Sequence, residues 1–533
     1  MHEHFFFYIC LLLIILLLVM LAQKIKVSYP IVLVLGGLVL SFVPAVPAID
    51  IDPQLIFLLF LPPLLYDAAW QISWKDFWKW RRVIASFAFP IVIITSAVIA
   101  VISNQLIPGF TIALGFLLGG IISPPDAVSA TSILKEVKVT KRASAIIEGE
   151  SLLNDASSLI VYRFALAAVL TGTFSAGDAS LKFLEVVVMG IATGLIVGLV
   201  FYALHRWMPT TASIDTVLTF IEPYIMYIIA EHFHYSGVLA VVTGGLYLSN
   251  RSHVILNHVS RLQSVNVWQT IGFLFNGFVF LLIGLEFTTV IKAVGNNVAD
   301  AVKYGLIISA AVIVIRLLST LGASVFTMFI SRFIKTADSR PGWRGPLVFG
   351  WAGMRGVVSL AAALSIPLVL KNGQPFPQRA LIIFITFVVI LVTLVFQGLT
   401  LPWVIRRFGE PERDYLISEH EQEAMVKTEM KNVALALLEK EYKDDVISNV
   451  LLKELKTRLA NELAYVDSRH ERSDEEAHLN KTKFHKAFKH VIEVQRHKLQ
   501  ELIRKPEFEE EVIKKYVSQL DLEEEKLRQQ FEF

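Results

Sequence analysis

The sequence predicts an all-α integral membrane protein that carries a charged helical tail after its last span. Two observations lead to this fold class. Hydrophobic residues make up 54% of the 533 residues and the mean hydropathy is +0.58, whereas a soluble domain must cover its surface with charge. In addition, charged residues are concentrated after residue 409, and the chain before that point is mostly apolar.

Thirteen apolar segments before residue 409 are candidate spans. A helix needs about 20 residues to cross the hydrocarbon, and within lipid it must satisfy its own backbone groups. The candidates lie near residues 5–22, 29–47, 53–71, 83–105, 109–134, 143–170, 180–205, 215–233, 237–250, 266–290, 301–330, 346–370 and 378–405. They predict about thirteen transmembrane helices in a domain over residues 1–408. A helical cytoplasmic domain follows over residues 409–533, and a regulatory role is the working hypothesis for it.

The tail is predicted to form amphipathic helices, because apolar residues recur there at helical spacing. Three stripes are visible: Val426, Met430, Val433 and Leu437; Leu452, Leu455, Leu459 and Leu463; and Phe484, Phe488 and Val491. The tail also holds 29 Asp/Glu and 22 Lys/Arg residues. No basic face predominates in it, so nucleic-acid binding is not expected.

Basic residues indicate how the chain is oriented in the membrane. Lys and Arg resist translocation and concentrate in cytoplasmic loops. Here they fall in alternate connections, among them residues 24–26, 75–82 and 406–407. This pattern predicts a multi-pass protein of the cell membrane, with its N-terminus outside and its tail in the cytoplasm.

A broken helix is predicted in the fifth apolar segment, which contains Ser123-Pro124-Pro125-Asp126 in mid-span. Proline donates no N–H, and its ring clashes with the carbonyl four residues earlier. The carbonyls of Gly120 and Ile121 then lose their partners, and freed carbonyls at membrane depth need protein, water or an ion. Half-helix ends of this kind form ion sites in transporters. Ser123 and Asp126 are therefore predicted cation ligands, and a kink without an ion site is the alternative.

The next segment carries Glu148-Gly149-Glu150-Ser151-Leu152-Leu153-Asn154-Asp155. At helical spacing Ser151 and Asp155 share one face, and Glu150 and Asn154 share the adjacent face. Hard cations take oxygen ligands, and the Asp155 carboxylate can also bind a proton. A carboxylate that holds either a proton or a cation, but not both, is sufficient for exchange. Buried ion pairs that only stabilise the bundle are the alternative reading of such carboxylates.

These motifs resemble the monovalent cation/proton antiporters, in the branch that contains bacterial and animal sodium/proton exchangers. The similarity rests first on Ile122, Ser123 and Asp126 in a broken helix, followed by the run Gly149 to Ala156. Further matches are Phe60-Leu61-Pro62-Pro63, Asp67, Glu222-Pro223, Glu231 to Ala240, Arg316 and Gly353-Met354-Arg355-Gly356. The resemblance covers most of residues 50–405 and does not extend to the tail.

The resemblance implies two inverted repeats, broken helices that cross near the ion site, and a homodimer. It also implies that Asp155 binds the transported ion and the proton, with Asn154, Asp126, Ser151 and Ser123 at the same site. Because Asn154 stands where the electrogenic branch has a second aspartate, the expected exchange is one Na⁺ for one H⁺ without net charge movement. Many relatives have Asp-Pro where this chain has Pro-Pro-Asp-Ala. The resemblance therefore does not decide whether Ser123 and Asp126 both bind the cation at the break.

Two arginines within apolar segments are predicted to form structural ion pairs. Arg316 and Arg355 keep their charge at every relevant pH, and within a membrane bundle they are expected to pair with carboxylates. The resemblance suggests Glu150 and Asp67 as the partners, without deciding which carboxylate pairs with which arginine.

The predicted function is exchange of Na⁺ for H⁺ by alternating access, with Li⁺ or K⁺ as alternative cations, which regulates intracellular pH and sodium. A K⁺/H⁺ antiporter, or a channel-like or sensory membrane protein with a pH-responsive tail, stays open. An enzyme is not expected, because the chain has no GxxxxGK[ST], HExxH or GxSxG motif and a single cysteine, Cys10. No cofactor is predicted. The expected partners are Na⁺, H⁺, the lipid bilayer and a second copy of the chain.

Overall fold

The structure is a computed structural model, which describes residues 2–44, 53–134, 137, 139–172, 176–333, 342–370, 373–409, 419–468, 474–503 and 510–531. Within these residues the regular structure is helical, and the only strand-like pairing is an isolated bridge between Val369 and Pro375. The chain separates into two compact units, Met1–Glu412 and Arg413–Phe533. The predicted all-α class is confirmed, whereas the separate roles assigned to the two parts of the chain stay predictions.

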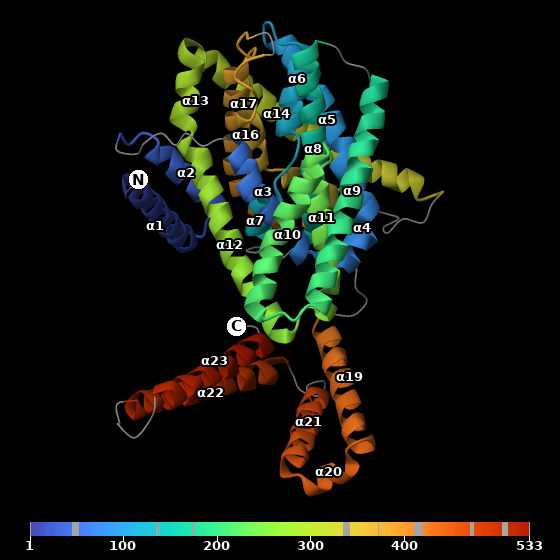
Figure 1. Cartoon of the computed structure of the whole chain (residues 1–533), viewed down its shortest axis with the longest axis vertical. Coiled ribbons are helices and arrows are strands. Elements are labelled where there is room, and N and C mark those ends of the chain that lie inside the picture. The colour runs from blue at the N-terminus through green and yellow to red at the C-terminus, as the bar shows by residue number, and fades with distance from the viewer. Residues whose placement is uncertain are drawn as a thin grey trace. The chain divides into compact units, whose positions relative to one another are not determined.

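The first unit is a bundle of closely packed helices (Figure 1). Its α-helices are α1 (His2–Ile25), α2 (Tyr29–Leu40), α3 (Pro53–Gln71), α4 (Trp74–Ser86), α5 (Val92–Leu106), α6 (Ile112–Ile122), α7 (Ala127–Leu134), α8 (Lys141–Thr171), α9 (Ala176–Trp207), α10 (Ala212–His232), α11 (Gly237–Ile255), α12 (His258–Leu285), α13 (Phe287–Val294), α14 (Val298–Ile330), α15 (Arg344–Trp351), α16 (Val357–Leu364), α17 (Arg379–Val392) and α18 (Gly398–Phe408). Short π-helical turns join α4 to α5 and α17 to α18.

All thirteen predicted segments are helical over most of their described length. Within the described part of the chain, nine helices or joined helices are long and apolar enough to cross a membrane. The other four predicted segments, 29–47, 53–71, 237–250 and 346–370, contain α2, α3, α11 and the pair α15 and α16; residues 45–47 lie outside the described residues. The helical membrane fold is therefore confirmed, and the number of spans and the inverted repeats stay predictions.

Two helices of the bundle are interrupted, and the two interruptions meet. The first lies between α6 and α7 and contains the prolines that predicted it. The second lies between Trp351, the last residue of α15, and Val357, the first residue of α16. The N–H of Asp126 in the first break donates to the carbonyl oxygen of Met354 in the second, over 2.7 Å. The four half-helices therefore converge on one region.

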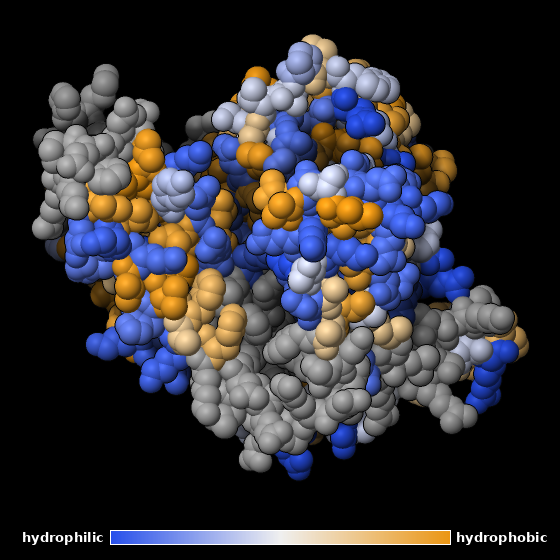
Figure 2. All heavy atoms as spheres, turned by 90° about the horizontal axis from the view of Figure 1, so that it is seen from below, coloured by the Kyte–Doolittle hydropathy of each residue, from blue (hydrophilic) through white to orange (hydrophobic). Residues whose placement is uncertain are grey.

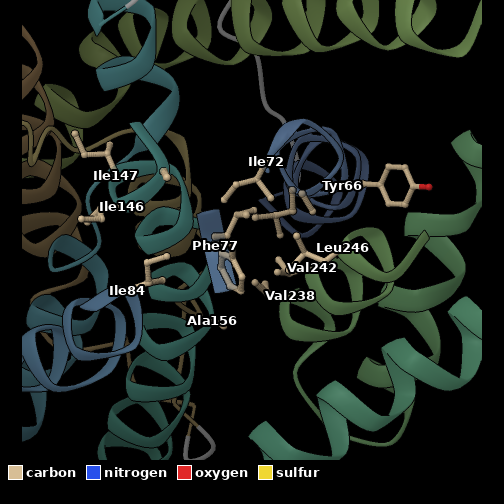
Figure 3. Packing of buried hydrophobic residues seen from close by; sticks show 14 of the residues in the cluster. Tyr66, Ile72, Phe77, Ile84, Ile146, Ile147, Ala156, Val238, Val242 and Leu246 are labelled. Carbon is tan, nitrogen blue, oxygen red and sulfur yellow. The ribbon is translucent and has the colours of Figure 1, made fainter. Parts of the chain in front are cut away.

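Apolar side chains fill the spaces between the helices of the first unit. Figure 3 shows one such region, in which Phe77 and Ile84 of α4 lie near Ile146 of α8 and Val242 of α11. All four side chains are buried. This packing holds α8, the helix that carries the second motif, in a fixed position relative to its neighbours.

The second unit contains two helical hairpins (Figure 1). In one, α19 (Glu419–Lys440) packs against α21 (Val450–Ser468), with the short α20 (Lys443–Ser448) between them; in the other, α22 (Asp474–Leu502) packs against α23 (Glu510–Phe531). The tail is helical, as the apolar stripes predicted.

The predicted stripe on α19 is not the face that packs. Val426, Met430 and Val433 are exposed, whereas Leu438 is buried. A helix in a two-helix hairpin buries one narrow face, so the spacing located the helix but not its contacts. Figure 2 shows hydrophilic and hydrophobic residues intermixed on the exposed surfaces of the described residues.

Candidate ion-binding site

A cavity of about 690 Å³ reaches into the first unit beside the two breaks. Side chains of α1, α2, α3, α7, α8, α12 and α16 line it. Four of the predicted site residues are among them: Asp67, Asp126, Ser151 and Asp155. Carboxylate and hydroxyl oxygens therefore face a space that is large enough for a cation together with water.

Asp155 lies in the middle of α8, and its side chain reaches the cavity wall. The residue is only 8% exposed. Among the described residues its carboxylate has no hydrogen-bond partner, although its main-chain oxygen accepts from the Ser158 hydroxyl at 3.0 Å. A largely buried carboxylate without a partner is unfavourable unless a proton or a cation neutralises it.

Ser151 lies one turn before Asp155 and faces the same cavity. Its hydroxyl oxygen accepts from the N–H of Ala127, the first residue of α7, at 3.0 Å. The hydroxyl thus ties α8 to the start of the second half-helix. The face shared by Ser151 and Asp155 is the face that the helical spacing predicted.

Asp126 caps the N-terminus of α7. Its carboxylate accepts from the N–H of Val128 at 3.0 Å, from the Ser129 hydroxyl at 2.6 Å and from the Ser129 N–H at 3.4 Å. This is the usual bonding of a helix N-cap, and the positive end of the helix dipole favours the negative charge. The sequence predicted a cation ligand here; the structure shows a capping residue whose carboxylate also borders the cavity.

Asn154 does not line the cavity. Its amide nitrogen donates to the carbonyl oxygen of Pro125 at 3.2 Å, and its Oδ1 is buried without a partner among the described residues. The side chain therefore satisfies a carbonyl inside the first break. This gives Asn154 a role in holding the break, which the sequence did not suggest.

Ser123 and Arg355 are not among the residues that line the cavity, and they meet at the end of α6. The guanidinium of Arg355 donates to the carbonyl oxygens of Ile122 at 2.8 Å and Ser123 at 3.2 Å, and also to that of Gly353. A fixed positive charge thus lies at the negative end of this half-helix. The Ser123 hydroxyl accepts from the Ser96 hydroxyl at 3.3 Å, and its role as a cation ligand stays a prediction.

The structure brings Arg316 of α14 together with Glu150 of α8. The two ends of the guanidinium lie 2.5 and 2.6 Å from the two carboxylate oxygens, and the side chains are 3% and 2% exposed. Within the described residues no ion pair joins Arg355 to Asp67, because Arg355 donates to main-chain oxygens. Asp67 instead accepts from Gln71 at 2.8 Å and borders the cavity.

Asn276 of α12 also lines this cavity, and it was not predicted from the sequence. Its amide nitrogen donates to the carbonyl oxygen of Gly272 at 2.8 Å, and its Oδ1 is buried without a partner in the described part of the chain. An amide oxygen is a suitable ligand for a hard cation. The available signal was a polar residue in the otherwise apolar run from 273 to 285.

A model of the family described as "Sodium/hydrogen exchanger, transmembrane" matches residues 10–407. The chain belongs to this family. This chain is 30% identical over 499 residues to the uncharacterized Na⁺/H⁺ exchanger YjcE of Escherichia coli K12, and the match covers 89% of each protein. It is 32% identical over 389 residues to the sodium, potassium, lithium and rubidium/H⁺ antiporter of Bacillus pumilus. This match covers 70% of the present chain but only 57% of the Bacillus pumilus protein.

The fold of this chain is that of a solved antiporter structure. The sodium proton antiporter MjNhaP1 from Methanocaldococcus jannaschii superimposes on it with a TM-score of 0.60 at 18% sequence identity. The match covers 75% of the present chain and 97% of MjNhaP1. At this identity the likeness establishes the fold alone. The family match confirms the predicted resemblance: the protein is a multi-pass membrane protein from a family of transporters, and not an enzyme.

Proposed function

We propose that this family member exchanges Na⁺ for H⁺ across the cell membrane, and that Asp155 carries the two ions in turn. The observation that supports this most directly is the Asp155 carboxylate, which borders the cavity and has no hydrogen-bond partner among the described residues. A proton or a Na⁺ can each neutralise it. Two ions that exclude one another at a single site are coupled in their transport.

The oxygens around Asp155 are those that a partly dehydrated Na⁺ takes as ligands. The Ser151 hydroxyl lies one turn away on the same helix, and Asp126 adds a second carboxylate to the cavity wall. Asn276 borders the same space. We propose these four residues as the cation site, with cavity water completing the coordination.

The expected stoichiometry is one Na⁺ for one H⁺. Asn154, next to Asp155, is neutral and is engaged with Pro125, and Asp126 is held by the start of α7. Among these groups only Asp155 lacks a hydrogen-bond partner in the residues that the structure describes, so one carboxylate alternates between two monovalent cations. Replacing one by the other moves no net charge across the membrane.

Alternating access is supported by an ion pair on the far side of Asp155 from the first break. Arg163 lies two turns after Asp155 on α8, and one of its nitrogens lies 2.6 Å from both carboxylate oxygens of Glu231 on α10. One of these oxygens also accepts from the N–H of Gly237 at 3.1 Å. We propose that this pair fastens α8 to α10 while the cavity is open at the other end.

The cavity is proposed to open to the cytoplasm. Gln23 and Gln71, near the C-terminal ends of α1 and α3, line it, and basic residues 24–26 and 75–82 follow these ends in the chain. Because basic connections lie on the cytoplasmic side, the N-terminus is then outside and the tail inside. Assembly as a homodimer and regulation of intracellular pH and sodium complete the proposal.

Potassium is the second candidate cation. The Bacillus pumilus relative is named for sodium, potassium, lithium and rubidium, and the cavity of about 690 Å³ is wide enough for any of these ions. A K⁺/H⁺ exchange at the same Asp155 is therefore the alternative that the test below must separate from Na⁺/H⁺ exchange.

The test is exchange by the purified full chain in proteoliposomes with a pH-sensitive dye inside. Na⁺, Li⁺ and K⁺ are titrated separately, with and without an imposed voltage. The expected result is cation-driven pH change that is insensitive to voltage and is lost in Asp155→Asn. Current through the protein without coupled proton movement would instead identify a channel.

The matched control is Glu185→Gln. Glu185 is an exposed carboxylate of α9 that pairs with Lys182. Its substitution by Gln removes one negative charge, as Asp155→Asn does, but at a position outside the cavity. This variant should exchange at the wild-type rate. Exchange by Asp155→Asn at that same rate would exclude Asp155 as the site.

A further inference from the structure

A second group of buried ionisable side chains lies outside the cavity. His205 of α9 is placed between two carboxylates of α10: its Nδ1 is 2.9 Å from Asp215 Oδ1 and its Nε2 is 2.7 Å from Glu222 Oε1. All three side chains are at most 1% exposed. None of them lines the cavity that contains Asp155.

The outer oxygens of the two carboxylates are also bonded. The Ser260 hydroxyl of α12 donates to Asp215 Oδ2 at 2.6 Å, and the Tyr66 hydroxyl of α3 donates to Glu222 Oε2. Figure 3 shows the Tyr66 hydroxyl directed away from the apolar side chains that pack around it. One continuous chain of hydrogen bonds therefore joins α12, α10, α9 and α3.

His205 is the basic side chain that lies between the two carboxylates of this group. In the described part of the chain, no Lys or Arg lies within ion-pair distance of Asp215 or Glu222. The neighbouring Arg206 directs its guanidinium to the main-chain oxygen of Val254 at 3.4 Å. The charged and titratable groups that face one another here are thus the two carboxylates, the imidazole and the Tyr66 phenol.

The hydrogen bonds fix the number of protons in the group. Since hydroxyls donate to the outer oxygens, any carboxyl proton must lie in a bridge to His205. Each bridge needs one hydrogen, which requires either an imidazolium between two carboxylates or a neutral imidazole with one protonated carboxyl. Both arrangements hold the same number of protons and a net charge of minus one. If one proton is removed, a lone pair of an imidazole nitrogen faces a lone pair of a carboxylate oxygen in one of the two bridges, with no hydrogen between them.

We propose that Asp215, His205 and Glu222 form a second proton-binding site, separate from the exchange cavity, whose bound proton holds α9, α10, α12 and α3 together. The ligand is H⁺ itself, and it is retained rather than transported. The inference does not depend on Na⁺/H⁺ exchange, because it concerns a group that the exchange site does not contact.

The proposal sets the sign of a pH effect on stability. Above about pH 6.5 the unfolded chain has a neutral imidazole and two carboxylates, which is one proton fewer than the folded group holds. Stability therefore falls as pH rises through this range, with a slope set by one proton. In Glu222→Gln the new amide donates to Nε2 and accepts from Tyr66, so every hydrogen bond is kept and the folded and unfolded states hold equal numbers of protons.

The experiment is thermal unfolding of the purified full chain, followed by tryptophan fluorescence between about pH 6.5 and 9. The wild-type midpoint should fall relative to that of Glu222→Gln by about 1–2 °C per pH unit. Asp215→Asn removes the same proton from the other side of His205 and should behave like Glu222→Gln. If one of the two carboxylate variants fails to fold, the unfolding midpoint of the other variant still tests the proposal.

Glu185→Gln is the control, since it removes an exposed carboxylate from the same helix as His205. Its midpoint should follow the wild type at every pH. The proposal is overturned if the folded carboxylate variants lose stability with rising pH as steeply as the wild type does.

Discussion

The main-chain N–H of Asp126 donates to the carbonyl oxygen of Met354, and this bond joins the two breaks where the half-helices meet. Both breaks also contribute to one charge arrangement. Arg355, next to Met354, lies at the negative end of α6, while the Asp126 carboxylate lies at the positive end of α7. Each half-helix end thus has a side chain of the opposite charge. The cavity wall beside Asp155 is built on this arrangement.

The apparent affinity for Na⁺ should depend on pH if both ions compete for Asp155. At low pH the proton occupies the carboxylate and excludes Na⁺, so the apparent KM for Na⁺ should rise as pH falls, by up to about tenfold per pH unit. The maximal rate at saturating Na⁺ should change much less. Dye-based exchange in proteoliposomes at several pH values measures both quantities, and a KM that is constant with pH would contradict competition at one site.

Arg316→Ala should destabilise the protein strongly. The substitution leaves Glu150 charged, buried and without its partner, which costs about 3–5 kcal/mol. We expect low expression of folded protein and a lower unfolding midpoint, measured by size-exclusion chromatography and thermal unfolding.

Replacing both partners, in Arg316→Met with Glu150→Leu, removes the isolated charge. This double variant should recover part of the stability that Arg316→Ala loses, because two apolar side chains need no ionic partner. Equal stability of Arg316→Ala and the wild type would show that the pair is not a structural requirement.

Gly356→Ala should impair exchange through Asp126. A Cβ at this position would overlap the Asp126 carboxylate, so the carboxylate and the start of α7 must shift. A displacement of this size beside an ion site is expected to slow exchange by about 10- to 100-fold. Initial rates of Na⁺-driven pH change measure the effect.

Gly322→Ala is the control for this substitution. An added Cβ at Gly322 in α14 has no neighbouring atom within 4 Å in the described structure, and alanine favours the helix by about 0.5–1 kcal/mol. Wild-type exchange is therefore expected. Similar rates in both variants would mean that the contact between Gly356 and Asp126 does not position the site.

The ion pair between Arg163 and Glu231 should influence the rate of exchange. Glu231→Gln keeps an acceptor for the Gly237 N–H but removes the charge. The side chains are 41% and 28% exposed, so the pair contributes at most about 1 kcal/mol. A two- to fivefold change in rate is the expected effect.

The charge swap Arg163→Glu with Glu231→Arg tests whether the pair itself is responsible. It should return the rate toward the wild-type value, which either single reversal should not do. A swap no better than the single reversals would show that the individual residues matter and the pairing does not.

The sequence predicted the helical class and the first break because both follow from local chemistry. Apolar length decides whether a segment can span lipid, and two prolines without N–H groups interrupt a helix wherever it packs. The shared face of Ser151 and Asp155 followed equally from helical spacing. These features depend on residues that are close in the chain.

The contacts that the sequence did not reveal join distant residues. Two of the partners of Arg355 are main-chain oxygens at the end of a half-helix more than 200 positions earlier in the chain, and any residue type supplies such an oxygen. The bonds of His205 with Asp215 and Glu222 need α9 and α10 to pack at one particular register. Neither arrangement leaves a residue pattern that spacing alone can identify.

The bond from Asn154 to Pro125 limits how this protein can change its ion stoichiometry. An aspartate at position 154 has no N–H to offer, and its carboxylate would face the carbonyl oxygen of Pro125 in a dry interior. A second acidic group at position 154 can keep this bond only while it is protonated, because the O–H of a neutral carboxyl donates to the same carbonyl oxygen. Ionisation at position 154 would therefore be coupled to the packing of the first break.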